Sequence, residues 1–310
     1  SEIAAETFAR AGHADKSSVL RGLSTRMTID EKVDLIICDH VGYFGLDYGI
    51  LSLLQDARSR FLRPGGRIMP AGVDLFLAPV GSEACALAAF GWSGPEVPPA
   101  LHWITELSVN SKHAVNLTPE DILGVPMEID NVNFMTETRS FFSWKSKLKI
   151  QKAGEMHGIA GWFDCDLGEG EKMTNSPLDP DRIDRSQAFL PISKPLKVEP
   201  GDEIRVSLAT RPDINMFAWT VEHVPSGWSC RHSTWEGQVF GARDLRPAQP
   251  HHIPKLTANA QSREIVLSYC DGKRSVAEIG AAVLKDHPNL FPTPEAISHF
   301  VAACLGNSTQ

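Results

Sequence analysis

Residues 32–70, KVDLIICDHVGYFGLDYGILSLLQDARSRFLRPGGRIMP, decide the fold of the first part of this chain. The stretch opens with residues 33–38, a short apolar run that is typical of a strand buried on both faces of a parallel sheet. Residues 50–61 then repeat apolar side chains at spacings of three and four, which predicts a helix that Pro64-Gly65-Gly66 stops. Residues 67–80 have the composition of another strand. The stretch therefore predicts a β-α-β unit.

An acidic residue, Asp39, directly follows the first of these strands. Open α/β sheets bind ligands at the carboxyl ends of their strands, so Asp39 is a candidate reactive-site carboxylate. The structural alternative is a strand-end carboxylate that accepts hydrogen bonds from backbone N–H groups. Its location favours the catalytic interpretation. For the neighbouring Cys38, packing at the strand end is favoured over a role as nucleophile.

The overall composition excludes several classes of protein. The chain has 310 residues, 42% of them hydrophobic and 22% charged, which is ordinary for a soluble globular protein of two or three domains. Its net charge of −8 argues against nucleic-acid or membrane-surface partners. No run is long enough to span a membrane, and no signal peptide opens the chain. Six cysteines without a C-x-x-C motif indicate no metal site and a cytoplasmic location.

The opening stretch resembles the protein arginine methyltransferase family. In that family a buried strand leads into a loop with two glutamates, and the Gly42-Tyr43-Phe44 triplet and Pro64-Gly65-Gly66 fit the same frame. Asp39 stands at the place of the first glutamate. Tyr48 stands at the place of the second, with Asp47 one residue earlier. The resemblance implies methyl transfer from S-adenosyl-L-methionine, with Asp39, Asp47 and Tyr48 as the catalytic candidates.

The same resemblance places the cofactor near the start of the chain. Residues 1–12 predict a helix, residues 17–23 a short strand and residues 24–26 a polar loop that would border the adenine. The expected cofactor-binding residues are Leu23, Ser24, Thr25 and Asp39. The family's glycine-rich loop and acidic ribose-binding residue would lie upstream of residue 1, so residues 1–79 are expected to be a truncated, partial Rossmann-like domain.

Residues 127–224 alternate short β-type runs with turn clusters, which predicts an antiparallel barrel or sandwich. Residues 156–164, MHGIAGWFD, are similar to the His-Gly…Trp-Phe-Asp motif of the barrel in the same family. We therefore expect an antiparallel β-barrel domain over residues 80–225, with an arm near residues 90–115. By resemblance this arm docks on a second subunit and implies a homodimer. The alternative is that its tryptophans pack within their own protomer.

The family's Thr-His-Trp active-site motif would fall at Ile183-Asp184-Arg185, where it is absent. Asp184, in place of the histidine, and Tyr43 are the expected substrate-binding residues. Because aspartate is one methylene shorter than glutamate, a bidentate clamp on a guanidinium would sit differently at Asp39. An amine, a hydroxyl or a modified peptide is therefore as acceptable a methyl acceptor as arginine.

The chain changes character again after Pro225. Residues 226–255 are rich in Gly, Pro and His and predict a linker, and residues 256–310 predict a small helical domain. Ser275 and Glu278 form a capping box before an apolar helical repeat. The tail resembles the winged-helix domains of the pyrroloquinoline-quinone D type, which can bind a leader peptide. Few cations occupy its second helix, so docking of a peptide or of another part of the same chain is favoured over DNA binding.

The expected fold class is α/β plus all-β: a partial Rossmann-like methyltransferase sheet, an antiparallel β-barrel and a small α-helical winged-helix domain. The leading functional hypothesis is a methyltransferase that acts on a nitrogen or oxygen of a peptide, a protein or a small molecule. The second is a non-catalytic protein that uses the barrel and the tail for recognition. The third is a peptide-maturation enzyme whose tail captures its substrate.

Overall fold

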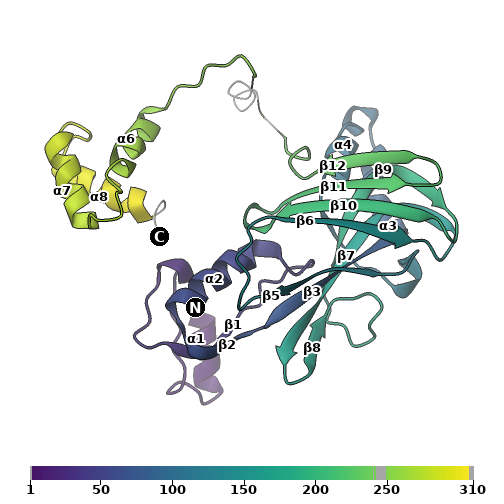
Figure 1. The fold of residues 1–310 in the computed structure, drawn as a ribbon, viewed down its shortest axis with the longest axis horizontal. Helices are drawn as coiled ribbons and strands as arrows, with labels where there is room; N and C mark the ends of the chain where they lie inside the picture. Colours follow the sequence, from purple (N-terminus) through teal and green to yellow (C-terminus); the bar gives the residue numbers. More distant parts are fainter. Residues whose placement is uncertain (1, 240, 242–248, 307–310) are drawn as a thin grey trace. The chain divides into compact units, whose positions relative to one another are not determined.

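The computed structural model describes residues 2–239, 241 and 249–306 (Figure 1). The chain divides into two compact units, Ser1–Val239 and Phe240–Gln310, and each is described by itself. The finer division of the first unit into domains remains a prediction.

The predicted β-α-β unit is confirmed. It consists of β1 (Val33–Ile37), α2 (Ile50–Arg60) and β2 (Leu62–Met69). The two strands pair in parallel, with Ile36 opposite Ile68. Helix α2 buries an apolar stripe of Ile50, Leu51 and Leu54, as its spacing predicts. The helix ends at Arg60, so the Pro64-Gly65-Gly66 segment lies inside β2 and not at the helix terminus.

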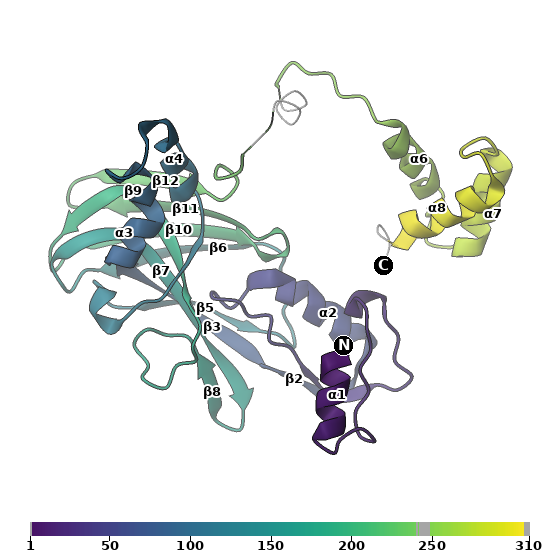
Figure 2. The same ribbon diagram turned by 180° about the vertical axis from the view of Figure 1, so that it is seen from behind.

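The single strand expected over residues 67–80 is in fact two strands. After β2 the chain passes Pro70 and enters β3 (Gly72–Val80), which pairs antiparallel with other strands. Met69 still pairs with Ile37 of β1, whereas Gly72 already pairs with Asn133. The division has a physical reason, because proline has no N–H to continue a ladder. The two strands join the small parallel sheet to the large antiparallel one (Figures 1 and 2).

The chain before β1 is only partly as expected. The predicted helix is present as α1 (Glu2–Arg10). The strand expected over residues 17–23 is wrong, because these residues form no ladder and lead directly into the short 3₁₀ helix η1 (Ser24–Arg26). Leu20 and Leu23 are more than half exposed, so this segment has no core face to stabilise a strand.

Two antiparallel sheets form the larger part of the first unit. In spatial order, the six-stranded sheet contains β4 (His113–Val115), β9 (Gln187–Val198), β7 (Gly154–Gly168), β3 and β5 (Met127–Asn133), with β8 (Glu171–Thr174) paired to β7. The four-stranded sheet contains β12 (Trp228–Ser233), β11 (Met216–His223), β10 (Glu203–Arg211) and β6 (Phe142–Lys149). Strand β12 lies in the range expected to be a linker.

The two sheets share a hydrophobic core but not a continuous ladder. Phe163 from the six-stranded sheet and Phe217 and Trp219 from the four-stranded sheet belong to one buried cluster. Among the described residues no strand pairing joins one sheet to the other. Of the two architectures expected from the sequence, barrel or sandwich, the strand pairing gives two antiparallel sheets packed through their inner side chains and no closed barrel among the described residues.

The arm expected near residues 90–115 is largely helical. It follows β3 as α3 (Glu83–Phe90), η3 (Gly91–Ser93), η4 (Pro99–Leu101) and α4 (Ile104–Val109). The remaining 3₁₀ helices of the first unit are η2 (Asp47–Gly49), η5 (Pro119–Asp121) and η6 (Pro212–Ile214). None of the helices in the described residues combines the length and the apolar character needed to cross a bilayer.

The second unit is a bundle of three helices, α6 (Ala258–Leu267), α7 (Val276–Asp286) and α8 (Pro294–Gly306). Val266, Ile279, Val283, Ile297 and Val301 form its core. The capping box at the start of α7 is present as predicted. Residues 249–306 contain no strand, so the β-hairpin wing of a winged helix is not part of this described segment.

Gly161 offers a test of how the acid-bearing loop packs on the sheet. A Cβ at this position of β7 would lie 2.5 Å from Cε2 of the buried Phe44 ring. We expect Gly161→Ala to lower the free energy of unfolding by about 1–3 kcal/mol, because a packed core accommodates an added methyl poorly. All seven tryptophans precede residue 240, so tryptophan fluorescence during urea unfolding reports on the first unit.

Gly22→Ala is the matched control, since a Cβ there makes only ordinary contacts with Met27. Its effect should stay within about 0.5 kcal/mol. Equal stabilities of the two variants would contradict the packing described for Phe44.

Candidate active site

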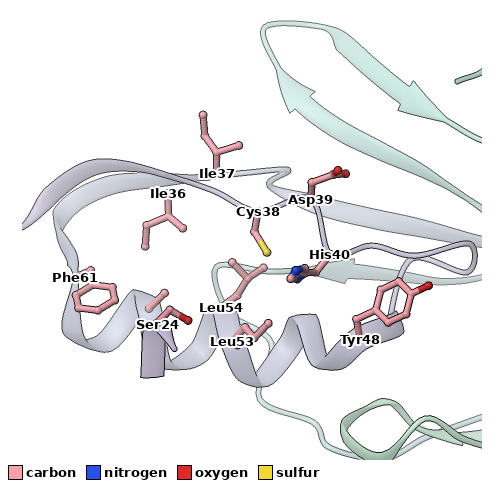
Figure 3. A pocket seen from close by; sticks show the side chains of 11 residues that line it. Ser24, Ile36, Ile37, Cys38, Asp39, His40, Tyr48, Leu53, Leu54 and Phe61 are labelled. Carbon is pink, nitrogen blue, oxygen red and sulfur yellow. The ribbon is translucent and has the colours of Figure 1, made fainter. Parts of the chain in front are cut away.

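Two adjoining cavities surround the end of β1. The larger one, about 750 Å³, lies between β1 and α2 and is shown in Figure 3. Its lining is Ser24, Ile36, Ile37, Cys38, Asp39, His40, Tyr48, Leu53, Leu54, Ala57 and Phe61. Ile36 and Cys38 point from β1 toward α2, and Phe61 and Tyr48 lie at opposite ends (Figure 3). We call this space the donor cavity.

The smaller cavity, about 360 Å³, has a more polar lining and is called the acceptor cavity. It is bounded by Asp39, Gly42, Tyr43, Tyr48, Asp184, Arg185 and Ser186. Asp39 and Tyr48 line both cavities. The two spaces therefore meet at a carboxylate and a phenol hydroxyl.

The structure brings most of the residues expected from the sequence into this region. Tyr43 and Asp184, the expected substrate-binding residues, both line the acceptor cavity. Ser24 lines the donor cavity, whereas its neighbours Leu23 and Thr25 do not. Asp47 lines neither cavity.

Asp39 is paired with a cation from a distant segment. Arg185 Nη2 donates to Asp39 Oδ1 at 3.1 Å and lies 3.4 Å from Oδ2. Arg185 Nη1 also donates to the carbonyl of Gly42 at 3.4 Å. The Asp39 side chain remains 74% exposed, so its carboxylate faces the cavities despite the pair.

Asp47 has a different environment, because it is buried beneath the loop. Its Oδ2 accepts hydrogen bonds from the backbone N–H groups of Tyr43 and Phe44, each at 2.9 Å. Its Oδ1 forms an ion pair with Lys112, and both side chains are at most 5% exposed. Lys112 also donates to Asn215 Oδ1 at 3.2 Å and lies 4.2 Å from the centre of the Phe217 ring. Asp47 therefore organises the loop from inside.

Burial and charge act in opposite directions on Lys112. Removal of water lowers the pKa of the Lys112 ammonium below its usual value, and the adjacent Asp47 carboxylate partly restores it. A buried cation paired with a buried carboxylate is held in one geometry, because separating the pair would leave two uncompensated charges.

The loop needs two unusual backbone conformations to place these groups. Gly42 has φ of +63°, and a Cβ at this position would overlap Asp47, so only glycine fits. Tyr48 has φ of +56° although it carries a side chain. Left-handed backbone at a tyrosine is uncommon, and here it turns the ring outward, where it is 61% exposed. This conformation points Tyr48 toward both cavities while Asp47 points inward.

The two tyrosines at the site interact. Their rings are 6.3 Å apart in an edge-to-face arrangement. Hydrogen bonding to Tyr48, burial and the nearby Asp47 charge raise the pKa of Tyr43 to about 12. Tyr43 therefore stays a neutral phenol at physiological pH and can donate or accept hydrogen bonds.

Arg60 fixes the wall of the donor cavity that carries Ser24. Its Nη2 donates to the carbonyl of Ser24 at 2.7 Å and its Nη1 to that of Met27 at 2.6 Å. Asp56 holds the guanidinium through an ion pair of 2.5 Å. The last turn of α2 thus positions the η1 segment.

The donor cavity fits part of S-adenosyl-L-methionine. Its volume lies within the roughly 300–1,000 Å³ that is typical of small-molecule sites, and its mostly apolar lining suits an adenine ring. The Asp39 carboxylate suits the positive sulfonium. The eleven lining residues include no lysine or arginine for the cofactor's carboxylate. In the part of the chain that the structure describes, no group of three or more His, Cys, Asp or Glu could hold a metal ion.

Sequence reasoning missed the two cations at this site. Lys112 lies in the region expected to be an arm, and no local pattern connects it with Asp47, 65 residues earlier. Arg185 stands at the tryptophan position of the absent Thr-His-Trp motif, where only the neighbouring Asp184 was expected to act. The charge change at that position is the signal that could have found Arg185.

The comparisons with known proteins confirm the resemblance to arginine methyltransferases. Residues 101–218 match the family model described as the arginine methyltransferase oligomerization subdomain. The two packed sheets and the preceding β-α-β unit have the arginine methyltransferase fold, with mixed sheets and helices.

Two curated relatives illustrate the resemblance. Protein arginine N-methyltransferase 6 of Xenopus laevis is 26% identical over 229 residues, covering 69% of this chain and 67% of that protein. Probable protein arginine N-methyltransferase 6.1 of Oryza sativa subsp. japonica is 28% identical over 213 residues, covering 66% of this chain and 52% of that protein. The match thus spans half to two thirds of the length of these relatives.

Two solved structures share the fold. The Trypanosoma brucei PRMT1 enzyme-prozyme heterotetrameric complex with AdoHcy has a TM-score of 0.64 at 19% identity, covering 74% of this chain and 77% of that chain. Protein arginine methyltransferase 10 of Arabidopsis thaliana, in an open conformation, has a TM-score of 0.61 at 18% identity, covering 74% and 79%.

The buried ion pair can be tested by removing its cation. We expect Lys112→Met to lower the free energy of unfolding of the first unit by about 3–5 kcal/mol, because Asp47 would remain buried without a counter-charge. Tryptophan fluorescence in urea measures the change.

Lys145→Met, on the exposed side of β6, is the matched control and should change stability by less than about 0.5 kcal/mol. The double variant Lys112→Met with Asp47→Asn should recover part of the loss, since a neutral amide oxygen still accepts from the loop N–H groups. An unchanged stability of the single variant would refute the assigned role of the pair.

Proposed function

We propose that this protein is an S-adenosyl-L-methionine-dependent methyltransferase that modifies a nitrogen or oxygen nucleophile of a peptide, a protein or a small molecule. The observation that carries the proposal is the shared boundary of the two cavities at Asp39 and Tyr48. Group transfer needs a donor and an acceptor held close together in fixed orientation, and two adjoining cavities supply that arrangement. The named activity of the relatives, protein arginine N-methylation, supports the same reaction class.

When bound, the cofactor would supply an electrophilic methyl group on a sulfonium and a thioether leaving group for an acceptor's lone pair. Asp39 would orient an N–H or O–H of the acceptor and offset the positive charge that develops on it. Tyr48 and Tyr43 would fix the acceptor by hydrogen bonds. The released proton would pass to a carboxylate at the cavity or to water. Ser24 and the apolar wall of α2 would hold the adenosine part.

A second candidate function is a non-catalytic binding protein. It is favoured by the charge state of the loop, since Asp39 and Asp47 are both paired with cations of the same chain and a tyrosine stands at the second acidic position. In this alternative the sheets and the helical tail serve recognition. Cofactor binding separates the two candidates.

Oligomerisation through the arm is part of the proposal. The match of residues 101–218 to an oligomerization subdomain supports it, and so do the exposed apolar side chains of the arm. Within residues 90–115, Trp92 is 44% exposed, Leu101 38% and Trp103 53%. Exposed apolar side chains that adjoin one another mark contact surfaces. We propose that the protein is a homodimer and that it is located in the cytoplasm. We also propose that its helical tail is related to winged-helix domains and docks a peptide.

The cofactor proposal is tested by calorimetric titration of S-adenosyl-L-methionine into the full chain. We expect saturable binding, weakened by up to about fivefold in Asp39→Asn, because the attraction between the carboxylate and the sulfonium charge is lost and an exposed charge pair contributes about 0.2–1 kcal/mol. Asp34→Asn is the matched control, since that carboxylate lies on β1, just before Asp39 in the chain, and pairs with Arg63 outside the cavities. Absence of binding both by this chain and by a chain extended upstream of residue 1 would reject the enzyme and favour the binding protein.

The oligomer is tested by sedimentation velocity. We expect Trp103→Ser to shift the chain from dimer to monomer at micromolar concentration, because the residue would lose its buried area in the contact. Phe141→Ser removes an aromatic side chain of similar exposure from the start of β6 and should leave the dimer intact. A monomeric unaltered chain, or an unaffected variant, would contradict the proposed arm contact.

A further inference from the structure

The acceptor cavity already contains a guanidinium, that of Arg185. Its Nη2 contacts both carboxylate oxygens of Asp39, at 3.1 and 3.4 Å, and its Nη1 contacts the Gly42 carbonyl. The two residues are separated by 146 positions in the sequence, so the tertiary fold creates this contact. A substrate guanidinium that entered the cavity would bind the same two carboxylate oxygens of Asp39, since a carboxylate can accept two parallel N–H hydrogen bonds from a guanidinium.

The backbone around Arg185 is anchored, which keeps its side chain at this place. The carbonyl of Arg185 accepts a hydrogen bond from Gln187 Nε2 at 3.1 Å, and the next carbonyl, that of Ser186, accepts from Asn175 Nδ2 at 2.8 Å. Gln187 and Asn175 are both at most 2% exposed. The Arg185 side chain itself is 26% exposed. The guanidinium therefore extends from a fixed base into the cavity.

No second carboxylate at the site replaces Asp39. Asp47 is buried and paired with Lys112, so it cannot reach a ligand in the cavity. Asp184 lines the cavity but, like Asp39, is exposed to solvent, where an ion pair contributes little. The buried Asp47–Lys112 pair and the Asp39–Arg185 pair are each neutral, so the one remaining negative charge is that of the hydrated Asp184. A cationic acceptor would find no desolvated carboxylate to bind.

We propose that Arg185 is the specificity-determining residue of the acceptor cavity and that it excludes guanidinium substrates by occupying their position. The acceptor is then an uncharged group that carries an N–H or O–H nucleophile, held by Asp184 and the hydroxyls of Tyr43 and Tyr48. The description of the bound group as a methyl acceptor rests on the proposed function. The geometry on which it stands, a cavity with an internal guanidinium, does not depend on the cofactor.

The test is a calorimetric titration with acetyl-arginine-amide, a probe with one guanidinium, in the absence of cofactor. We expect Arg185→Gln to bind the probe about two- to fivefold more tightly than the unaltered chain, because Asp39 becomes available and this is the range expected when an exposed ion pair is gained. Arg182→Gln is the matched control: its guanidinium donates to the Pro177 carbonyl and does not line the acceptor cavity, so the affinity should stay unchanged. Combining Arg185→Gln with Asp39→Asn should abolish the gain.

A second variant, Arg185→Ala, removes the guanidinium without placing another large side chain in the cavity and should show the same gain, with tryptophan fluorescence in urea confirming that both variants fold. The proposal is overturned if the unaltered chain binds the probe as tightly as these variants, or if neither variant gains affinity. The outcome is independent of the cofactor titration. Failure of both this chain and the extended chain to bind S-adenosyl-L-methionine, together with a gain by Arg185→Gln, would reject the proposed reaction and keep the assignment of Arg185.

Discussion

The site depends on one buried amide, that of Asn175. Its side chain is completely buried, and its Nδ2 donates to the carbonyls of Tyr43 at 3.0 Å and Ser186 at 2.8 Å. Its Oδ1 accepts from the N–H of Phe163 at 3.0 Å. A buried amide is costly unless its groups are satisfied, and here both ends are. The three partners belong to three segments, so the same contacts that satisfy the amide bring those segments together.

The consequence is a cavity built from parts that are distant in the sequence. The loop after β1 supplies Asp39 and Tyr48, and the segment before β9 supplies Asp184 and Arg185. Besides the bridge through Asn175, the loop is held by the buried Phe44 ring, by the Asp47–Lys112 pair and by the contacts of Arg185. Because the bridge is made by backbone carbonyls, it fixes the course of the chain and leaves the side chains at the cavity free to vary. This explains how altered chemistry can occupy a retained fold.

Local patterns predicted some of the helices and strands correctly, failed for others and did not predict the contacts between distant residues. The β1–α2–β2 unit and the capping box at Ser275 follow from neighbouring residues, and both are confirmed. The strand expected over residues 17–23 failed because β-type composition gives no strand without a neighbour to pair with. The single strand over residues 67–80 failed at Pro70, where the chain changes from one sheet to another.

The sequence predicted where the candidate site residues lie better than it predicted which of their carboxylates are paired with cations. Asp39 lies at the strand end as the β-α-β pattern requires, and Tyr43 and Asp184 line the cavity as the resemblance implies. The ion pairs of Asp39 and Asp47 join residues 146 and 65 positions apart, and no periodicity or spacing encodes such pairs. Whether a carboxylate is free is decided by its partners in three dimensions. Sequence reasoning could therefore find the acids and not their neutralisation.

The substitutions in the acidic loop form one coherent change. Asp47 lies one position before the expected second acid, and at that position it faces inward, where it accepts two backbone N–H groups and pairs with Lys112. Gly42 makes this possible, since no side chain there could coexist with Asp47. Tyr48 is then the residue that faces the cavities, in a left-handed conformation. The loop is held in shape by the buried charge of Asp47. The cavity is lined by the paired carboxylate of Asp39 and by the hydroxyls of Tyr43 and Tyr48. These groups suit a neutral ligand better than a cation.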